Sequence, residues 1–416
     1  MRVVIVGAGI GGLAAALSLH AAGCHDVLVA EAAPRIRPLG VGINLLPHAV
    51  RELTELGLAE RLAALSVATA ELAYYSRHGQ AIWSEPRGRA AGYHWPQYSV
   101  HRGRLQMLLL TAVRERLGPE AVRTGAALTG FRQDERGAVA EFGAEEVRCD
   151  VLIGADGIHS AVRRVLYPDE GEPRWNGLVL WRGVTRAEPF LTGRSMIMAG
   201  NGTEKFVAYP ISGPGPDGRV LVNWIAERPL AEVRTGRGDW HGRADLAAVQ
   251  SHFADWRYDW LDVPGVIGGA EEAYEYPMVD RDPLPRWSHG RVTLLGDAAH
   301  PMYPIGSNGA SQAVLDGRVL ARELARRPDP ERTLPAYEEA RRPPTTAVQL
   351  ANRQQGPEVV MKLVHERSPE PFTDLETVLP RAERDEIARR YKRLAGFDPA
   401  VLNERASYDV RPSSRR

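Results

Sequence analysis

The feature that most constrains the fold is a glycine-rich turn between an apolar strand and a helix at the start of the chain. Residues 2–6 (RVVIV) are a short β-branched run, typical of strands buried on both faces of a parallel sheet. The run ends in Gly7-Ala-Gly9-Ile-Gly11-Gly12, and an alanine- and leucine-rich helix is predicted to follow. Residues 26–30 (DVLVA) give a second strand. This unit predicts an α/β fold built on a Rossmann-like dinucleotide-binding domain.

Each glycine of this turn has a physical reason to be there. Gly7 permits the tight turn, Gly9 lets the backbone approach a pyrophosphate, and Gly12 allows the helix to pack closely on the strand. The start of the helix supplies free N–H groups and a positive dipole end for the phosphates. Glu31 follows the second strand, where it can accept hydrogen bonds from a ribose diol, which argues against NADP in this site. The unit leaves NAD and FAD open.

A second glycine–acid motif, almost 300 residues later, favours FAD. Residues 291–295 (RVTLL) predict a strand, Gly296 and Asp297 follow it, and a helix is predicted from about 310 to 327. FAD needs such a distant element because its ribityl chain and ring extend beyond the pyrophosphate. Asp297 is placed to bind a ribityl hydroxyl, and Ser307 or Asn308 is expected to cap the helix. The helix start would then stabilise negative charge on the reduced flavin.

A third motif lies between these two. Residues 150–154 (DVLIG) predict a strand, and Asp156-Gly157 leads into a helix that starts near Ser160. Asp156 has an alternative interpretation as an ordinary turn residue. Upstream, Arg102 stands at the start of an amphipathic helix, where it can meet a phosphate.

Together the three motifs resemble the group A flavoprotein monooxygenases, the p-hydroxybenzoate hydroxylase type, over roughly residues 2–350. The resemblance implies reduction of FAD by NADH or NADPH and oxygen transfer from a flavin C4a-hydroperoxide, without a protein nucleophile or a metal. The loop 40–42 resembles the family segment that lets the flavin move between two positions. The implied cofactor-binding residues are Gly7, Gly9, Gly12, Glu31, Gly42, Arg102, Asp156, Gly157, Arg163, Gly296, Asp297, Pro304, Gly306, Asn308 and Gly309.

Within this family, four stretches resemble the members that act on phenazines. They are residues 36–44, 83–88, 276–286 and 303–317. An aromatic or heteroaromatic small-molecule substrate is therefore expected. A flavin epoxidase or oxidative cyclase acting on an indole or terpenoid stays open, because it would share every motif. A halogenase is disfavoured, since its Trp-x-Trp-x-Ile-Pro signature and a suitably placed lysine are missing. A non-catalytic FAD-binding protein is a further alternative.

The middle of the chain, residues 175–280, alternates apolar and polar residues and predicts an antiparallel sheet that roofs the substrate. Core packing is the competing interpretation for its aromatic residues. Arg182 is the sharper candidate, because a substrate carboxylate would satisfy a buried arginine. The substrate-contact candidates are Trp181, Arg182, Tyr209, Trp224 and Met278. His94, His101 and Tyr75 are unranked candidates for a general base, and His300 is expected to be structural.

Composition adds limits on partners and location. The chain has 52 basic and 52 acidic residues, so no nucleic acid or anionic membrane partner is indicated. No apolar run reaches the roughly 18–20 residues of a membrane span, and two cysteines cannot build a disulfide framework. A cytoplasmic monomer or homodimer is expected. The predicted domains are an FAD-binding domain at 1–174 with an excursion near 72–100, an antiparallel substrate domain at 175–280, the second FAD-binding part at 281–345, and a helical C-terminal region at 346–416.

Overall fold

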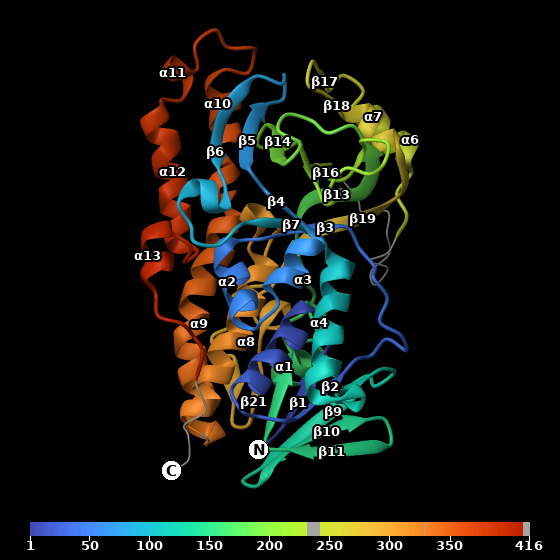
Figure 1. Cartoon of the computed structure of the whole chain (residues 1–416), viewed down its shortest axis with the longest axis vertical. Helices are drawn as coiled ribbons and strands as arrows, with labels where there is room; N and C mark the ends of the chain where they lie inside the picture. The colour runs from blue at the N-terminus through green and yellow to red at the C-terminus, as the bar shows by residue number, and fades with distance from the viewer. Residues whose placement is uncertain (231–241, 328, 411–416) are drawn as a thin grey trace.

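A six-stranded, mostly parallel sheet forms the centre of the lower half of the molecule (Figure 1). The structure is a computed structural model and describes residues 1–230, 242–327 and 329–410. Val3, Val4 and Ile5 in the first strand are fully buried, as expected for a strand covered on both faces. The strand order is β20 (Ser288–His289), β21 (Val292–Leu294), β12 (Val151–Gly154), β1 (Arg2–Val6), β2 (Asp26–Ala30) and β8 (Val122–Arg123).

Helices cover the faces of this sheet and join distant parts of the chain. The helix α1 (Ile10–Ala21) packs against both α4 (Arg102–Leu117) and α8 (Gly309–Arg326), so the first and last thirds of the chain share one core. The shorter elements of this half are α2 (Pro47–Glu55), α3 (Ala59–Ala64), α5 (Ala161–Leu166), the sheet of β3 (Gly42–Leu45), β7 (Tyr98–His101) and β4 (Ser66–Ala68), and the sheet of β9 (Gly130–Asp134), β10 (Gly137–Phe142) and β11 (Glu145–Cys149).

A seven-stranded, mainly antiparallel sheet lies above the first one (Figure 1). Two of its strands come from much earlier in the chain than the other five, and one of them, β5, pairs parallel with β14. The order is β19 (Ala270–Asp280), β13 (Arg174–Ala187), β16 (Val220–Pro229), β15 (Lys205–Pro210), β14 (Ser195–Gly200), β5 (Glu71–Ser76) and β6 (Ala81–Pro86). The α/β class with an inserted antiparallel sheet is thereby confirmed.

The two faces of this upper sheet have different neighbours. Successive residues of a strand point to opposite faces, so Trp181 packs in an aromatic core on the outer face, whereas Leu180 belongs to a second core on the inner face. The elements that cover the outer face are α6 (Leu246–His252), β17 (Arg257–Tyr258), β18 (Leu261–Asp262) and α7 (Val263–Gly268).

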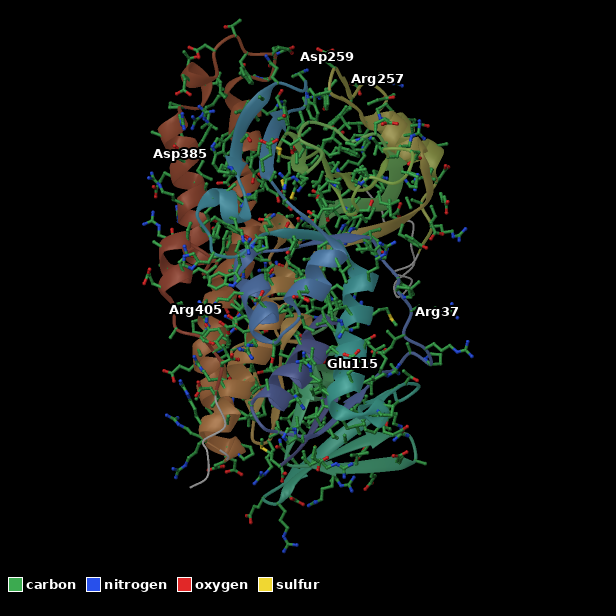
Figure 2. All side chains as sticks on the ribbon, in the orientation of Figure 1. Arg37, Glu115, Arg257, Asp259, Asp385 and Arg405 are labelled. Carbon is green, nitrogen blue, oxygen red and sulfur yellow. The ribbon has the colours of Figure 1, made fainter. Side chains whose placement is uncertain are left out.

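Helices of the C-terminal region run along one side of both sheets (Figure 1). They are α9 (Pro330–Arg353), α10 (Val359–Arg367), α11 (Leu375–Val378), α12 (Arg381–Leu394) and α13 (Pro399–Glu404). The predicted boundary after residue 345 falls inside α9. Arg405, labelled in Figure 2, forms an ion pair with Glu52 of α2 and ties the tail to the N-terminal half. Residues 411–416 of the predicted region lie outside the described residues. Among the helices of the described ranges, none is long and apolar enough to cross a membrane.

Candidate active site

A cavity of about 890 Å³ extends from the glycine turn after β1 to the inner face of the upper sheet. Gly7 and Gly9 line its lower end, and the exposed Arg37 stands at its rim and points outward in Figure 2. A side chain at Gly9 would meet no atom within 4 Å, so the turn leaves open space against bare backbone. That space and the start of α1 fit a pyrophosphate, and the cavity volume is within the range of cofactor sites.

Most of the predicted cofactor residues line this one cavity, although they come from distant segments. They are Gly7, Gly9, Glu31, Gly42, Arg102, Asp156, Gly157, Gly296, Asp297, Pro304, Asn308 and Gly309. Three predicted residues do not. A Cβ at Gly12 would lie 2.0 Å from the Gly7 carbonyl oxygen, so Gly12 serves helix–strand contact. Gly306 lines a smaller neighbouring cavity, and Arg163 lies behind the wall.

Glu31 holds the ends of two loops together at the edge of the cavity. Its carboxylate accepts a hydrogen bond from the Ala8 N–H at 2.9 Å and another from the Ala33 N–H at 2.9 Å. These bonds fix the carboxylate beside the glycine turn. Two carboxylate oxygens have further acceptor capacity, so the group can also receive hydroxyl donors from a ribose.

Asp156 and Arg163 have structural partners that the sequence did not reveal. The Asp156 carboxylate accepts from the Ala161 N–H at 2.7 Å and from the Ser160 hydroxyl at 2.5 Å, and burial raises its pKa. Arg163 is fully buried and donates to the carbonyl oxygens of Ala298 and Ala299 at 3.0 and 3.1 Å. Arg163 therefore fixes the loop that follows Asp297 and does not face the cavity, in contrast to the expectation from the family motif.

The Asp297 loop is held in place by a buried polar network. The Asp316 carboxylate accepts from the Gly296 N–H at 3.0 Å, lies 2.6 Å from the His300 Nε2 and accepts from the Arg341 Nε at 2.7 Å. Burial alone would raise the pKa of Asp316, but His300 and Arg341 outweigh it and lower the pKa to about 2. His300 is thus structural, as predicted. Asp297 itself faces the cavity, and burial raises its pKa.

Replacing Asp316 by asparagine is expected to destabilise the protein by roughly 3–5 kcal/mol, because Arg341 would keep a buried charge without its counter-ion. The folded pKa of about 2 lies below the ordinary 3.8. The carboxylate therefore stabilises the wild type above pH 3.8, and this contribution disappears as the pH falls through 2. Thermal unfolding at pH 7 and pH 3 would measure both effects. Asp385→Asn, at a partly exposed position labelled in Figure 2, is the control. Equal stability of Asp316→Asn and wild type would contradict the expectation.

The helix α8 begins at the cavity without a side-chain cap. The predicted capping by Ser307 or Asn308 is wrong, because the Asn308 Oδ1 accepts from the Gln312 side-chain amide at 3.3 Å and not from a backbone N–H. The Asn308 amide nitrogen donates to the Gly306 carbonyl at 3.1 Å and to the Tyr391 hydroxyl at 3.0 Å. Gly309 and Ala310, in the first turn of α8, line the cavity. Uncapped N–H groups at a helix start favour negative charge nearby, so this end of the cavity suits an anionic reduced flavin.

Only two of the five predicted substrate residues reach the cavity. Arg182 lines it and donates to the Gly42 carbonyl at 3.0 Å, and Tyr209 lines it with a pKa raised to about 12 by burial. Trp181 and Trp224 lie in the core on the outer face, where their indole N–H groups bond Glu275 at 2.9 Å and Thr185 at 3.0 Å. Met278 packs in the inner core beside Asn176. Strand alternation separates Trp181 and Trp224 from their neighbours Arg182 and Ile225 at the cavity.

None of the general-base candidates lines the cavity. His94 is exposed, His101 caps α4, and Tyr75 packs on Trp260 at 4.2 Å between ring centroids.

The loop at Gly42 is bound to the upper sheet through both backbone groups of this residue. The Gly42 N–H donates to the Asn223 side chain at 2.6 Å, and the Gly42 carbonyl accepts from Arg182.

Sequence reasoning missed a buried charge cluster on the upper wall. The Lys205 ammonium lies 3.0 Å from a Glu227 oxygen and forms a second ion pair with Glu358. All three side chains line the cavity, and the Glu358 carboxylate also accepts from the Gly306 N–H at 3.2 Å. Burial raises the pKa of Glu227. For Lys205, burial lowers the pKa, but the two carboxylates outweigh it and raise the pKa. The sequence signal that could have revealed this cluster is a charged residue in each of two otherwise apolar strands, Lys205 in β15 and Glu227 in β16.

Comparisons with known proteins agree with this geometry. Residues 1–182 and 275–351 match the family described as FAD binding domain. The chain is 50% identical to phenazine 1,6-dicarboxylic acid hydroxylase of Lysobacter antibioticus, over 84% of this chain and 89% of that one. It is 35% identical to 3-amino-4-hydroxybenzoate 2-monooxygenase of Streptomyces platensis, over 97% and 98%. The structure of 2,6-dihydroxypyridine-3-hydroxylase from Arthrobacter nicotinovorans superposes with a TM-score of 0.69 at 26% identity, over 85% and 92%.

The predicted cofactor and enzyme class are confirmed by these matches, and an epoxidase or cyclase is not favoured, since the relatives are aromatic hydroxylases. The chain belongs to the FAD-binding-domain family of flavoprotein monooxygenases, enzymes that use NAD(P)H and O2 to hydroxylate aromatic small molecules.

Proposed function

We propose that this enzyme hydroxylates a phenazine carboxylate or a closely similar fused aromatic carboxylate. The observation that carries the proposal is a row of apolar side chains on the inner face of the upper sheet, together with the 50% identity to a phenazine dicarboxylate hydroxylase. Ile225, Val207 and Met198 lie on adjacent strands in direct register and line the cavity. Such a wall suits the face of a flat, electron-rich ring system.

The protein's own residues bind, orient and shield. Gly9 and the start of α1 would hold the pyrophosphate, Glu31 the ribose, and Asp297 the ribityl chain. Bound FAD would supply the redox chemistry, in which two electrons from NAD(P)H and one O2 give one oxygen atom to the ring and the other to water. The start of α8 favours the negative charge of the reduced cofactor. The apolar wall keeps water from the reacting atoms.

Arg182 and Tyr209 remain proposed substrate-side contacts, at the edge of the apolar wall nearest Gly42. The Arg182 side chain donates a hydrogen bond to the Gly42 carbonyl and so links the apolar wall to the Gly42 loop. This hydrogen bond would break if the loop moves during reduction of the flavin. A cytoplasmic location is proposed from the need for NAD(P)H, and a monomer or homodimer stays a prediction.

The test is NADH and NADPH oxidation by the FAD-loaded enzyme with phenazine-1-carboxylate, phenazine, salicylate, 3-hydroxybenzoate and an indole, with products and H2O2 quantified. Phenazine-1-carboxylate is expected to stimulate oxidation most and to yield a product with one added oxygen. A compound that stimulates NAD(P)H oxidation but yields only H2O2 binds to the enzyme without being hydroxylated, because the reduced flavin then reacts with O2 without oxygen transfer to the ring. Best stimulation by the indole, with an oxygenated indole product, would contradict the proposal.

A further inference from the structure

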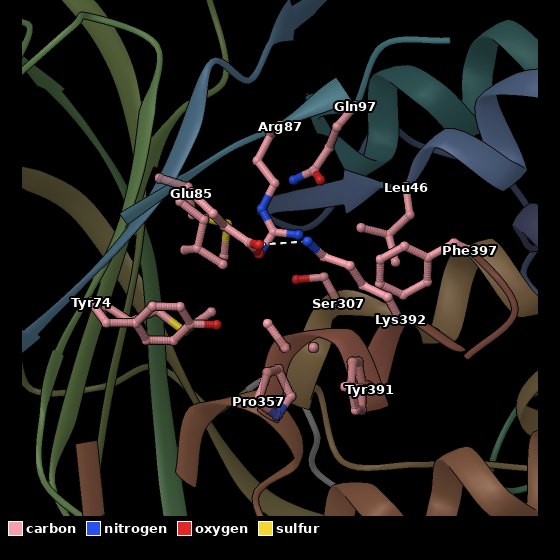
Figure 3. Close-up of a pocket in the computed structure, with 15 residues that line it drawn as sticks. Leu46, Tyr74, Glu85, Arg87, Gln97, Ser307, Pro357, Tyr391, Lys392 and Phe397 are labelled. Atoms are coloured by element: carbon pink, nitrogen blue, oxygen red, sulfur yellow. Dashed lines mark hydrogen bonds and ion pairs between the residues drawn. The ribbon is translucent and has the colours of Figure 1, made fainter. Parts of the chain in front are cut away.

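A second, smaller cavity of about 20 Å³ lies directly beside the large one, between the β5–β6 edge of the upper sheet, the loop before α8 and the helix α12 (Figure 3). Met196, Met198 and Ser307 line both cavities and so form the partition between them. Two of the three members of this partition are methionines, whose long unbranched side chains readily change conformation.

The small cavity carries an excess of positive charge. The Glu85 carboxylate lies 2.7 Å from the Arg87 guanidinium and 2.5 Å from the Lys392 ammonium, so one anion faces two cations. These side chains are 10%, 10% and 16% exposed. A buried charge without a counter-ion is costly. The two cations of this cluster therefore leave one positive charge that Glu85 does not balance, and a further anion would be favoured beside them.

Two polar atoms at this cavity lack partners among the described residues. The Tyr74 hydroxyl and the Arg87 Nε are both buried without a hydrogen bond. Figure 3 shows the Tyr74 hydroxyl pointing toward the space that Arg87 and Ser307 border. Buried polar groups are nearly always hydrogen-bonded. Since Arg87 Nε can only donate and a tyrosine hydroxyl can also donate, a ligand with acceptor oxygens fits both.

The register of the upper sheet places this small cavity at one end of the apolar wall. Arg182, Ile225, Val207, Met198 and Tyr74 are successive cross-strand partners, so they form one row across five strands. The row has polar ends and an apolar middle. Four strand spacings separate its ends by roughly 19 Å. Tyr74 is one spacing, roughly 4.8 Å, from Met198, within reach of a substituent on a ring held against Met198.

Of the other charged groups at the wall, the Lys205 cluster cannot take an anion. Lys205 already faces Glu227 and Glu358, so that cluster has one surplus negative charge and repels a carboxylate. The Arg87–Lys392 cluster has the opposite surplus. A volume of 20 Å³ holds about one water-sized group, so a carboxylate would fit only with a change of rotamer at Met196 or Met198.

We propose that the small cavity is the carboxylate-binding end of the substrate site, in which Arg87, Lys392 and Tyr74 hold the anionic substituent of the aromatic ring. The inference rests on the proposed function and adds the residues that select a carboxylated substrate. Arg182, at the far end of the row, donates to the Gly42 carbonyl and would contact the other end of the substrate.

The test compares binding of phenazine-1-carboxylate and uncharged phenazine to the FAD-loaded enzyme, followed by the change in flavin absorbance, which needs no turnover. Arg87→Met is expected to raise the Kd for the carboxylate roughly 10- to 100-fold, the cost of a charged hydrogen bond, and to leave the Kd for phenazine within about twofold. Arg87→Lys should recover part of the loss. Arg89→Met, at an exposed neighbouring position, is the control.

Lys392→Met acts on the same cluster from another element and is expected to show the same selective loss if Arg87→Met folds poorly. An equal loss for both ligands, or no loss in either variant, overturns the inference. Phenazine bound by the wild type as tightly as its carboxylate also overturns it. These results leave the proposed function intact as long as the wild type hydroxylates a phenazine, whereas a wild type that hydroxylates none overturns that function as well.

Discussion

A Gly9→Ala variant is expected to fold as the wild type does but to lose most of its FAD. The added methyl group meets no protein atom within 4 Å, so packing is undisturbed. It instead occupies the space in which the pyrophosphate approaches the backbone N–H groups, and the lost charge-assisted hydrogen bonds would weaken binding at least roughly tenfold. The ratio of flavin to protein absorbance after purification, and the FAD Kd of the stripped protein, measure the effect.

Two further glycines separate loss of cofactor from loss of fold. Gly213→Ala also meets no atom within 4 Å but is remote from the turn, so its FAD content should stay at the wild-type level. Gly12→Ala should lower the Tm of the protein itself, because the methyl group would lie 2.0 Å from the Gly7 carbonyl oxygen. Full flavin content in Gly9→Ala would show that the cofactor does not approach this turn.

The second large effect is expected for Lys205→Met. This change leaves Glu227 and Glu358 buried near each other without the cation between them. Breaking a buried ion pair by removing one partner costs roughly 3–5 kcal/mol, so the urea midpoint at pH 7 should fall substantially. Adding Glu227→Gln and Glu358→Gln to the same chain should restore much of the loss, since the uncompensated charges are then gone.

Lys362→Met is the matched control, because Lys362 is half exposed and its nearest carboxylate, on Glu366, is 3.6 Å away. Its urea midpoint should differ little from that of the wild type, as is usual for an exposed ion pair. A midpoint for Lys205→Met as high as that of Lys362→Met would mean that water already solvates the cluster, contrary to its buried position.

The strands β1 and β2 could be predicted to the residue because their information is local. An apolar β-branched run, a glycine turn and a terminal acid together specify a βαβ unit. The apolar wall of the cavity was harder to predict. The alternation of apolar and polar residues in a strand assigns them to two faces, but it does not say which face meets the FAD-binding domain. Trp181 and Arg182 are neighbours in sequence, yet only Arg182 reaches the cavity.

Features made by distant segments left no readable trace in the sequence. Glu358 joins Lys205 only because the C-terminal helices fold back along the upper sheet. Arg163 carries the family motif but is used to fix the loop after Asp297. Asn308 has the side chain of a helix cap, but its Oδ1 accepts from the Gln312 side chain, and its amide nitrogen donates to the Tyr391 hydroxyl, far along the chain. In each case tertiary contacts override a local preference.

The order of strands in the central sheet has a consequence for the synthesis of the enzyme. β1 pairs with β2 next to it in the chain, but its other neighbour, β12, is 148 residues later in register, and β12 pairs with β21. Pairings over such distances form late, after the intervening chain is available. A nascent chain that has not yet delivered β21 and the start of α8 has the glycine turn but not Asp297 opposite it. A cofactor site that includes Asp297 therefore requires the chain to be synthesised through β21 and the loop that follows it.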